Sequence, residues 1–161
     1  MKRAARFALV LALACSMANA STSLNPAALA RQLDNEGAKA TVHKMLESEW
    51  DSVLAYIEAG SAAWVALVPK LAEGTDAGYS EELGIGLAYA LPKNAKAVLL
   101  AIDPNNGPVL GVSRVCSAPF IEDTVKDIPA YIKDARAALS KVRVPSLQGV
   151  KKACLAELAK P

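Results

Sequence analysis

Residues 48–72, SEWDSVLAYIEAGSAAWVALVPKLA, decide the fold class of this chain. The large apolar residues of the first half recur at the three- and four-residue spacing of an amphipathic helix: Trp50, Val53, Leu54 and Ile57. The pattern predicts a helix over 49–59 that Ser48 caps and Gly60 ends. A further helix follows Ser61, and Pro69 is expected to kink or divide it.

Helices are predicted for the rest of the chain as well, because it is rich in alanine and leucine. It is also poor in the alternation of apolar and polar residues that marks strands. Capping and breaking residues place further helices over 26–33, 38–47, 81–91 and 95–102, with Asn25, Ser80 and Asn94 as caps. Residues 109–116 form a short helix or an extended link, a longer helix starts at 124 or 128 and runs to 142, and the last helix covers 146–159. The sequence predicts an all-α domain of about seven to nine short helices, arranged as a compact bundle or a short stack of two-helix repeats.

A weak internal repeat supports the second arrangement. The tripeptide Leu54-Ala55-Tyr56 recurs at 87–89, and Val65 corresponds in the same register to Val98. The two copies are 33 positions apart, and a period of about this length is typical of stacked helical repeats. Alanine-rich helices also resemble one another by composition alone, so both a true repeat and simple bundle packing stay open.

The first twenty residues have the layout of a secretory signal peptide. A basic start precedes an apolar stretch over 7–14 and the sequence Ala18-Asn19-Ala20. We expect residues 1–20 to be removed and residues 21–161 to form a single domain in the periplasm or outside the cell. Lipid attachment at Cys15 is the minor alternative. Later segments lack the roughly 20 apolar residues of a transmembrane helix, so none is expected.

Cysteine and charge counts restrict the partners. Cys116 and Cys154 are the two cysteines after residue 20, and an oxidising compartment favours a disulfide between them. Two free thiols or an intermolecular bridge are the alternatives. Removing Lys2, Arg3 and Arg6 leaves 18 − 3 = 15 basic against 16 acidic residues. This near-neutral balance gives no electrostatic signal for nucleic acid or anionic lipid, and it leaves the oligomeric state unknown.

The segment 74–81, GTDAGYSE, is the best local candidate for a binding site. Thr75 and Asp76 offer polar groups, Tyr79 offers an amphipathic ring, and Glu81 and Tyr89 extend the same region. The segment lacks the lysine and the spacing of a phosphate-binding loop, so we expect no cofactor. The alternative is a linker between helices with an Asx-type turn.

A catalytic interpretation rests on the acidic cluster Glu47, Glu49, Asp51 and Glu58. Two carboxylates are the machinery of glycan hydrolysis, although carboxylates near a helix start more often act as caps. His43 is the single histidine, and no nucleophile or metal-ligand pattern accompanies it, so no metal site is expected.

These observations favour a non-catalytic binding protein over an enzyme. The general make-up is similar to small secreted helical proteins of bacterial envelopes, many of which act by binding. We expect an inhibitor, an immunity-type protein or an adaptor that docks an envelope or secreted protein on a helical face or groove near residues 74–89. The alternatives are an envelope glycan hydrolase that uses a carboxylate of the 47–58 cluster, and a carrier of a small apolar ligand.

Overall fold

The computed structural model describes residues 24–105, 107–120 and 124–160, and the predicted signal peptide lies outside them. These residues form ten α-helices, one 3-10 turn and one isolated bridge between Asp103 and Gly111, which confirms the all-α prediction. The elements are α1 (Pro26–Glu36), α2 (Ala38–Lys44), α3 (Glu47–Glu58), α4 (Ala62–Val65), α5 (Val68–Ala72), α6 (Ala77–Ala90), α7 (Ala95–Ala101), α8 (Val112–Val115), α9 (Ile128–Ser140), η1 (Pro145–Leu147) and α10 (Gln148–Glu157).

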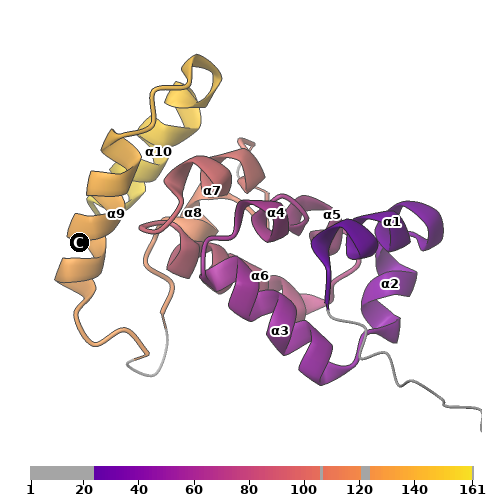
Figure 1. Ribbon diagram of the computed structural model, residues 1–161. Coiled ribbons are helices and arrows are strands. Elements are labelled where there is room, and N and C mark those ends of the chain that lie inside the picture. The colour runs from indigo at the N-terminus through magenta and orange to yellow at the C-terminus, as the bar shows by residue number, and fades with distance from the viewer. Residues whose placement is uncertain (1–23, 106, 121–123, 161) are drawn as a thin grey trace, which may run out of the picture.

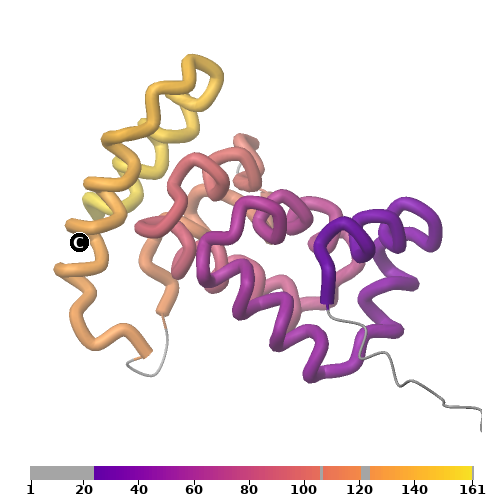
Figure 2. The backbone as a smooth tube through the Cα atoms, viewed as in Figure 1, coloured from indigo at the N-terminus to yellow at the C-terminus, as the bar shows by residue number. Residues whose placement is uncertain are grey.

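The molecule runs from α1 and α2 at one end to α9 and α10 at the other, with α3 to α8 between them (Figure 1). The pair α1 and α2 lies at one end, α3 packs against α6 in the middle, and the hairpin of α9 and α10 lies at the other end. The backbone trace shows the chain reversing at successive short turns (Figure 2). The main contact in the middle of the molecule joins helices that are not neighbours in sequence, because α3 packs on α6 across α4 and α5.

Local sequence signals explain several of the helix ends. The Asn25 side chain accepts hydrogen bonds from the amides of Ala27 and Ala28 and caps α1, as predicted. Asn94 caps α7 in the same way. Gly37 separates α1 from α2 with a φ of 81°, a left-handed conformation that glycine adopts without strain. Pro69 occupies the first turn of α5, so the predicted division of this region is confirmed.

Two predicted caps are wrong. Helix α3 begins before Ser48, because the Glu49 carboxylate accepts from the Leu46 amide at 2.9 Å and fixes an earlier start. Helix α6 begins before Ser80, because the Asp76 side chain accepts from the Tyr79 amide at 3.2 Å. Residues 77–81 are consequently helical, and Glu81 lies in the second turn of α6 instead of the first.

The two segments that contain the weak internal repeat form similar helix–turn–helix units, α3–α4 and α6–α7. Helix α3 packs on α6 and α4 packs on α7. Between the two turns, the Asn94 side-chain amide donates to the Gly60 carbonyl oxygen at 2.8 Å. Val65 and Val98 are both fully buried. The correspondence ends at Leu100, which is 62% exposed whereas the matching Leu67 is buried.

One connected cluster of buried apolar side chains extends from Leu29 in α1 to Leu158 after α10. The predicted disulfide joins Cys116, at the end of α8, to Cys154 in α10 with a Cα–Cα distance of 5.3 Å. The Tyr131 hydroxyl of α9 donates to the Ala88 carbonyl oxygen of α6 at 3.0 Å. Burial raises the pKa of this phenol, so it remains a donor.

Candidate functional site

Much of the predicted binding segment serves the structure at the start of α6. The Asp76 carboxylate is occupied as the helix cap. The Thr75 hydroxyl donates to the Ala72 carbonyl oxygen at 2.9 Å and lies 2.7 Å from the Ser80 hydroxyl. Gly74 is buried against α2, since a Cβ at this position would lie 2.4 Å from the Ala38 carbonyl group. The segment is therefore an ordered junction between α5 and α6.

The other three predicted binding residues lie in different surroundings. The Tyr79 ring packs on Trp50 of α3 with 4.6 Å between ring centroids. Tyr89 is partly buried and packs on Phe120 at 4.7 Å. Glu81 is exposed and lines a groove on the outer side of α6. The structure does not gather the five predicted residues into one surface, and Glu81 is the one that lines this groove.

The groove has a volume of about 380 Å³ and runs between α6 and residues 108–119. One wall is a single face of α6, whose members recur at helical spacing: Ala77, Ser80, Glu81, Gly84 and Ile85. The opposite wall is formed by Pro108, Val109, Arg114 and Pro119. We call this feature the α6 groove. It combines apolar walls with one carboxylate and one guanidinium, a lining suited to an amphipathic ligand.

Two glycines inside α6 acquire separate roles from this geometry. A Cβ at Gly86 would lie 3.5 Å from the Ile57 side chain, so Gly86 lies at the contact between α3 and α6, where a methyl group would still fit. A Cβ at Gly84 would lie 3.7 Å from the Val109 carbonyl oxygen, between the two walls of the α6 groove. Gly84 therefore forms the floor of the groove, and the absence of a side chain there gives the groove its depth.

Sequence reasoning missed the second wall of the groove. Arg114 lies on the short helix α8 and Pro108 in the preceding loop, more than twenty residues beyond the α6 wall. No local motif marks these residues as partners of Glu81. The one available signal was Gly84, because a glycine inside a helix costs about 1 kcal/mol relative to alanine and so needs a compensating reason.

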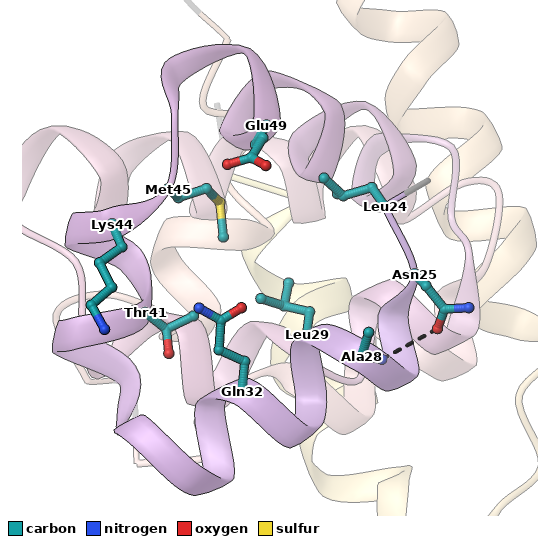
Figure 3. Close-up of a pocket in the computed structure, with 9 residues that line it drawn as sticks. All are labelled: Leu24, Asn25, Ala28, Leu29, Gln32, Thr41, Lys44, Met45 and Glu49. Atoms are coloured by element: carbon teal, nitrogen blue, oxygen red, sulfur yellow. Dashed lines mark hydrogen bonds between the residues drawn. The ribbon is translucent and has the colours of Figure 1, made fainter. Parts of the chain in front are cut away.

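A second, smaller cavity of about 230 Å³ lies between α1, α2 and the start of α3 (Figure 3). Its polar groups are largely engaged within the protein: Lys44 pairs with Glu36 at 2.9 Å, and Glu49 accepts from Leu46. The Thr41 hydroxyl is buried and has no hydrogen-bond partner among the described residues. In Figure 3 this hydroxyl is turned away from Met45 and Glu49 on the other side of the cavity. The α6 groove is the better candidate site.

The four carboxylates of the acidic cluster on α3 lie in different surroundings. Glu47 and Asp51 are exposed, and Glu49 is engaged at the helix start. Glu58 differs from the others, because partial burial raises the pKa of its carboxyl while the nearby Lys93 opposes that effect. Glu58 lies three helical turns from Glu47, at the other end of α3.

The aromatic side chains divide between core and surface. Trp50 and Trp64 are buried in the core, and the Tyr56 ring stacks on Trp64 with 5.0 Å between centroids while remaining 45% exposed. His43 is exposed on α2. Within the described residues, no group of three or more histidine, cysteine or acidic side chains is arranged to hold a metal ion.

Comparisons with known proteins give no assignment: no family model, no curated protein and no solved structure matches this chain. No single helix in the described part of the chain is both long and apolar enough to cross a membrane.

Proposed function

We propose that this chain is a non-catalytic binding protein of the periplasm or the extracellular space, and that the α6 groove docks a segment of a protein partner. An inhibitor, immunity-type or adaptor role fits this proposal. The observation that carries it is the glycine floor of the groove, because a helix interior gains stability from alanine and Gly84 has room for a methyl group. Glycine at position 84 thus keeps the α6 groove deep, although alanine there would make α6 more stable.

The lining of the groove indicates the chemistry of its occupant. Glu81 and Arg114 are exposed and lie on opposite walls, while Ile85, Val109 and Pro119 supply apolar contact. An extended or helical peptide segment that carries an apolar anchor between charged or polar neighbours would use both kinds of contact. Arginine and large apolar anchors are the groups that most often dominate such interfaces.

The two helix glycines of α6 provide a matched test. Gly84→Ala adds a methyl group to the groove floor, whereas Gly86→Ala adds one between α3 and α6, and both additions make ordinary van der Waals contacts. The immobilised mature chain, residues 21–161, is incubated with an envelope extract, and captured proteins are quantified by mass spectrometry. We expect Gly84→Ala and Arg114→Ala to reduce capture of a stoichiometric partner by roughly tenfold or more.

Gly86→Ala should capture the same partner as the unmodified chain, and thermal melts verify that every variant is folded. Equal capture by Gly84→Ala and Gly86→Ala would remove the α6 groove from the binding surface. Failure of the unmodified chain to capture any stoichiometric partner would contradict the proposed function as a whole.

A further inference from the structure

Although the chain is nearly neutral as a whole, its acidic and basic side chains are concentrated in different halves of the sequence. Residues 24–92 contain ten acidic and four basic side chains, whereas residues 93–161 contain six acidic and eleven basic ones. Helices α1 to α6 make up one part of the molecule and α7, α9 and α10 lie toward its other end, so this separation in sequence is also a separation in space (Figures 1 and 2). The part built from α1 to α6 is acidic, chiefly through α3 and α6, and the end that holds α7, α9 and α10 is basic.

The basic end carries two separate hollows that both border α7, and we call the two together the α7 furrow. Its first part, of about 310 Å³, is lined by four cations and no carboxylate: Lys93, Lys96, Lys141 and Arg143. Its second part, of about 480 Å³, is apolar and contains Leu99, Leu100, Ile102, Leu147 and Val150. Lys96 and Leu100 are one helical turn apart on α7, so one exposed face of that helix borders both parts.

These side chains are available for a partner. Leu100 is 62% exposed, and Lys96, Lys141 and Arg143 are exposed without a carboxylate at ion-pair distance among the described residues. Arg143 donates one bond to the Ser140 carbonyl oxygen and retains further N–H groups. An exposed leucine beside unpaired cations is complementary to an apolar side chain flanked by carboxylates.

The acidic part of the same molecule presents that combination at the start of α3. Leu46 is 65% exposed and is the most exposed large apolar residue of the described chain. It directly precedes the exposed Glu47, and the exposed Asp51 lies one turn further along the helix. We call these three residues the Leu46 projection. Neither of its carboxylates forms an ion pair among the described residues.

We propose that the chain self-associates through these two surfaces. Leu46 of one copy occupies the apolar part of the α7 furrow of a second copy, and Glu47 and Asp51 lie against the furrow cations Lys96, Lys141 and Arg143. Opposite charges bring unlike ends of two molecules together and keep like ends apart. The contact does not involve the α6 groove, so it stands or fails independently of the proposed function.

The test is the mass of the mature chain in solution. Sedimentation and light scattering should show a mass above that of the monomer that grows with protein concentration. The association constant should fall several-fold when salt is raised from about 50 to 500 mM, because salt screens exposed charges. Leu46→Arg and Leu100→Asp should each lower the association constant by roughly tenfold or more. Both side chains are exposed, so melting temperatures should stay close to that of the unmodified chain.

Mixing the two variants distinguishes this contact from general stickiness. Leu46→Arg retains an intact α7 furrow and Leu100→Asp retains an intact Leu46 projection, so an equal mixture should form a complex of twice the monomer mass although neither variant associates alone. Ala66→Asp, which changes an exposed residue that lines neither part of the α7 furrow and is not in the Leu46 projection, should behave as the unmodified chain. A monomeric mass at all concentrations, or unchanged association of either leucine variant, would overturn the proposal.

Discussion

Trp50 donates its indole N–H to the Glu82 carboxylate, with 2.6 Å between Nε1 and Oε2, and this bond links α3 to α6. Only 2% of Trp50 is exposed, so the indole ring belongs to the core while its one polar atom reaches a carboxylate near the surface. Hydrogen bonds to charged groups are stronger than neutral ones. The bond therefore fixes how the two central helices lie against each other.

Removing the acceptor should destabilise the protein. Glu82→Ala leaves the indole N–H without its partner, and we expect the free energy of unfolding to fall by about 1–3 kcal/mol. Glu82→Gln keeps an oxygen acceptor, so its free energy of unfolding should fall clearly less than that of Glu82→Ala. Urea unfolding followed by tryptophan fluorescence measures both. Equal losses in the two variants would show that the hydrogen bond is not what Glu82 contributes.

The disulfide should provide a large part of the stability. Cys116 and Cys154 are 38 residues apart, and closing a loop of that size restricts the unfolded chain by about 4 kcal/mol. A reducing agent, or the double variant Cys116→Ala, Cys154→Ala, should lower the free energy of unfolding by about that amount in urea titrations. Two titratable thiols in the denatured, unreduced chain would contradict the pairing.

Helix ends were predictable where one side chain decides them. Asn25 and Asn94 each precede a helix and each cap it, and Gly37 adopts the left-handed conformation that ends α1. Such signals depend on atoms within three or four residues, which is the range that sequence patterns report.

Prediction failed at the start of α6. The pattern indicated Ser80 as the cap, whereas the Asp76 carboxylate caps the helix and the Ser80 hydroxyl lies 2.7 Å from the Thr75 hydroxyl. The prediction of the binding surface failed for a different reason. Arg114 reaches Glu81's groove only through the packing of α8 on α6, which the sequence pattern does not encode locally. The contact of Gly84 with Val109 likewise joins two segments that no local pattern pairs.

Gly74 should be one of the least replaceable residues of the chain. A Cβ there would lie 2.4 Å from the backbone of Ala38 and 2.8 Å from the Lys39 nitrogen, and backbone atoms cannot rotate away. We expect Gly74→Ala to lower the free energy of unfolding by about 1–3 kcal/mol, the usual cost of overpacking. Chemical denaturation of both proteins measures this difference.

Gly78→Ala is the matched control, because its Cβ would meet only Asp76 at 3.7 Å and the residue lies in the first turn of α6. That variant should be neutral or stabilised by up to about 1 kcal/mol, since alanine is the better helix former. Equal stability of the two variants would mean that α5 and α2 are farther apart than the structure places them.

Glu58 should make the stability of the protein depend on pH. Burial raises the pKa of its carboxyl above the ordinary value of 4.5, so between the unfolded and folded pKa values the folded chain binds more protons than the unfolded chain. The free energy of unfolding therefore falls as pH rises through this window. Glu58→Gln cannot titrate, so its stability relative to the unmodified chain should increase as pH rises above 4.5.

Urea unfolding of both proteins at several pH values across that window measures the difference, with Glu47→Gln as a control at an exposed carboxylate of the same helix. A constant difference across the window would contradict burial as the cause of the raised pKa. The same variant addresses the enzymatic alternative, because Glu58 is the carboxyl of the α3 cluster whose pKa is raised, as a general acid requires. If α3 serves only to hold α6 and its groove, Glu58→Gln changes the pH profile of stability and leaves partner capture intact.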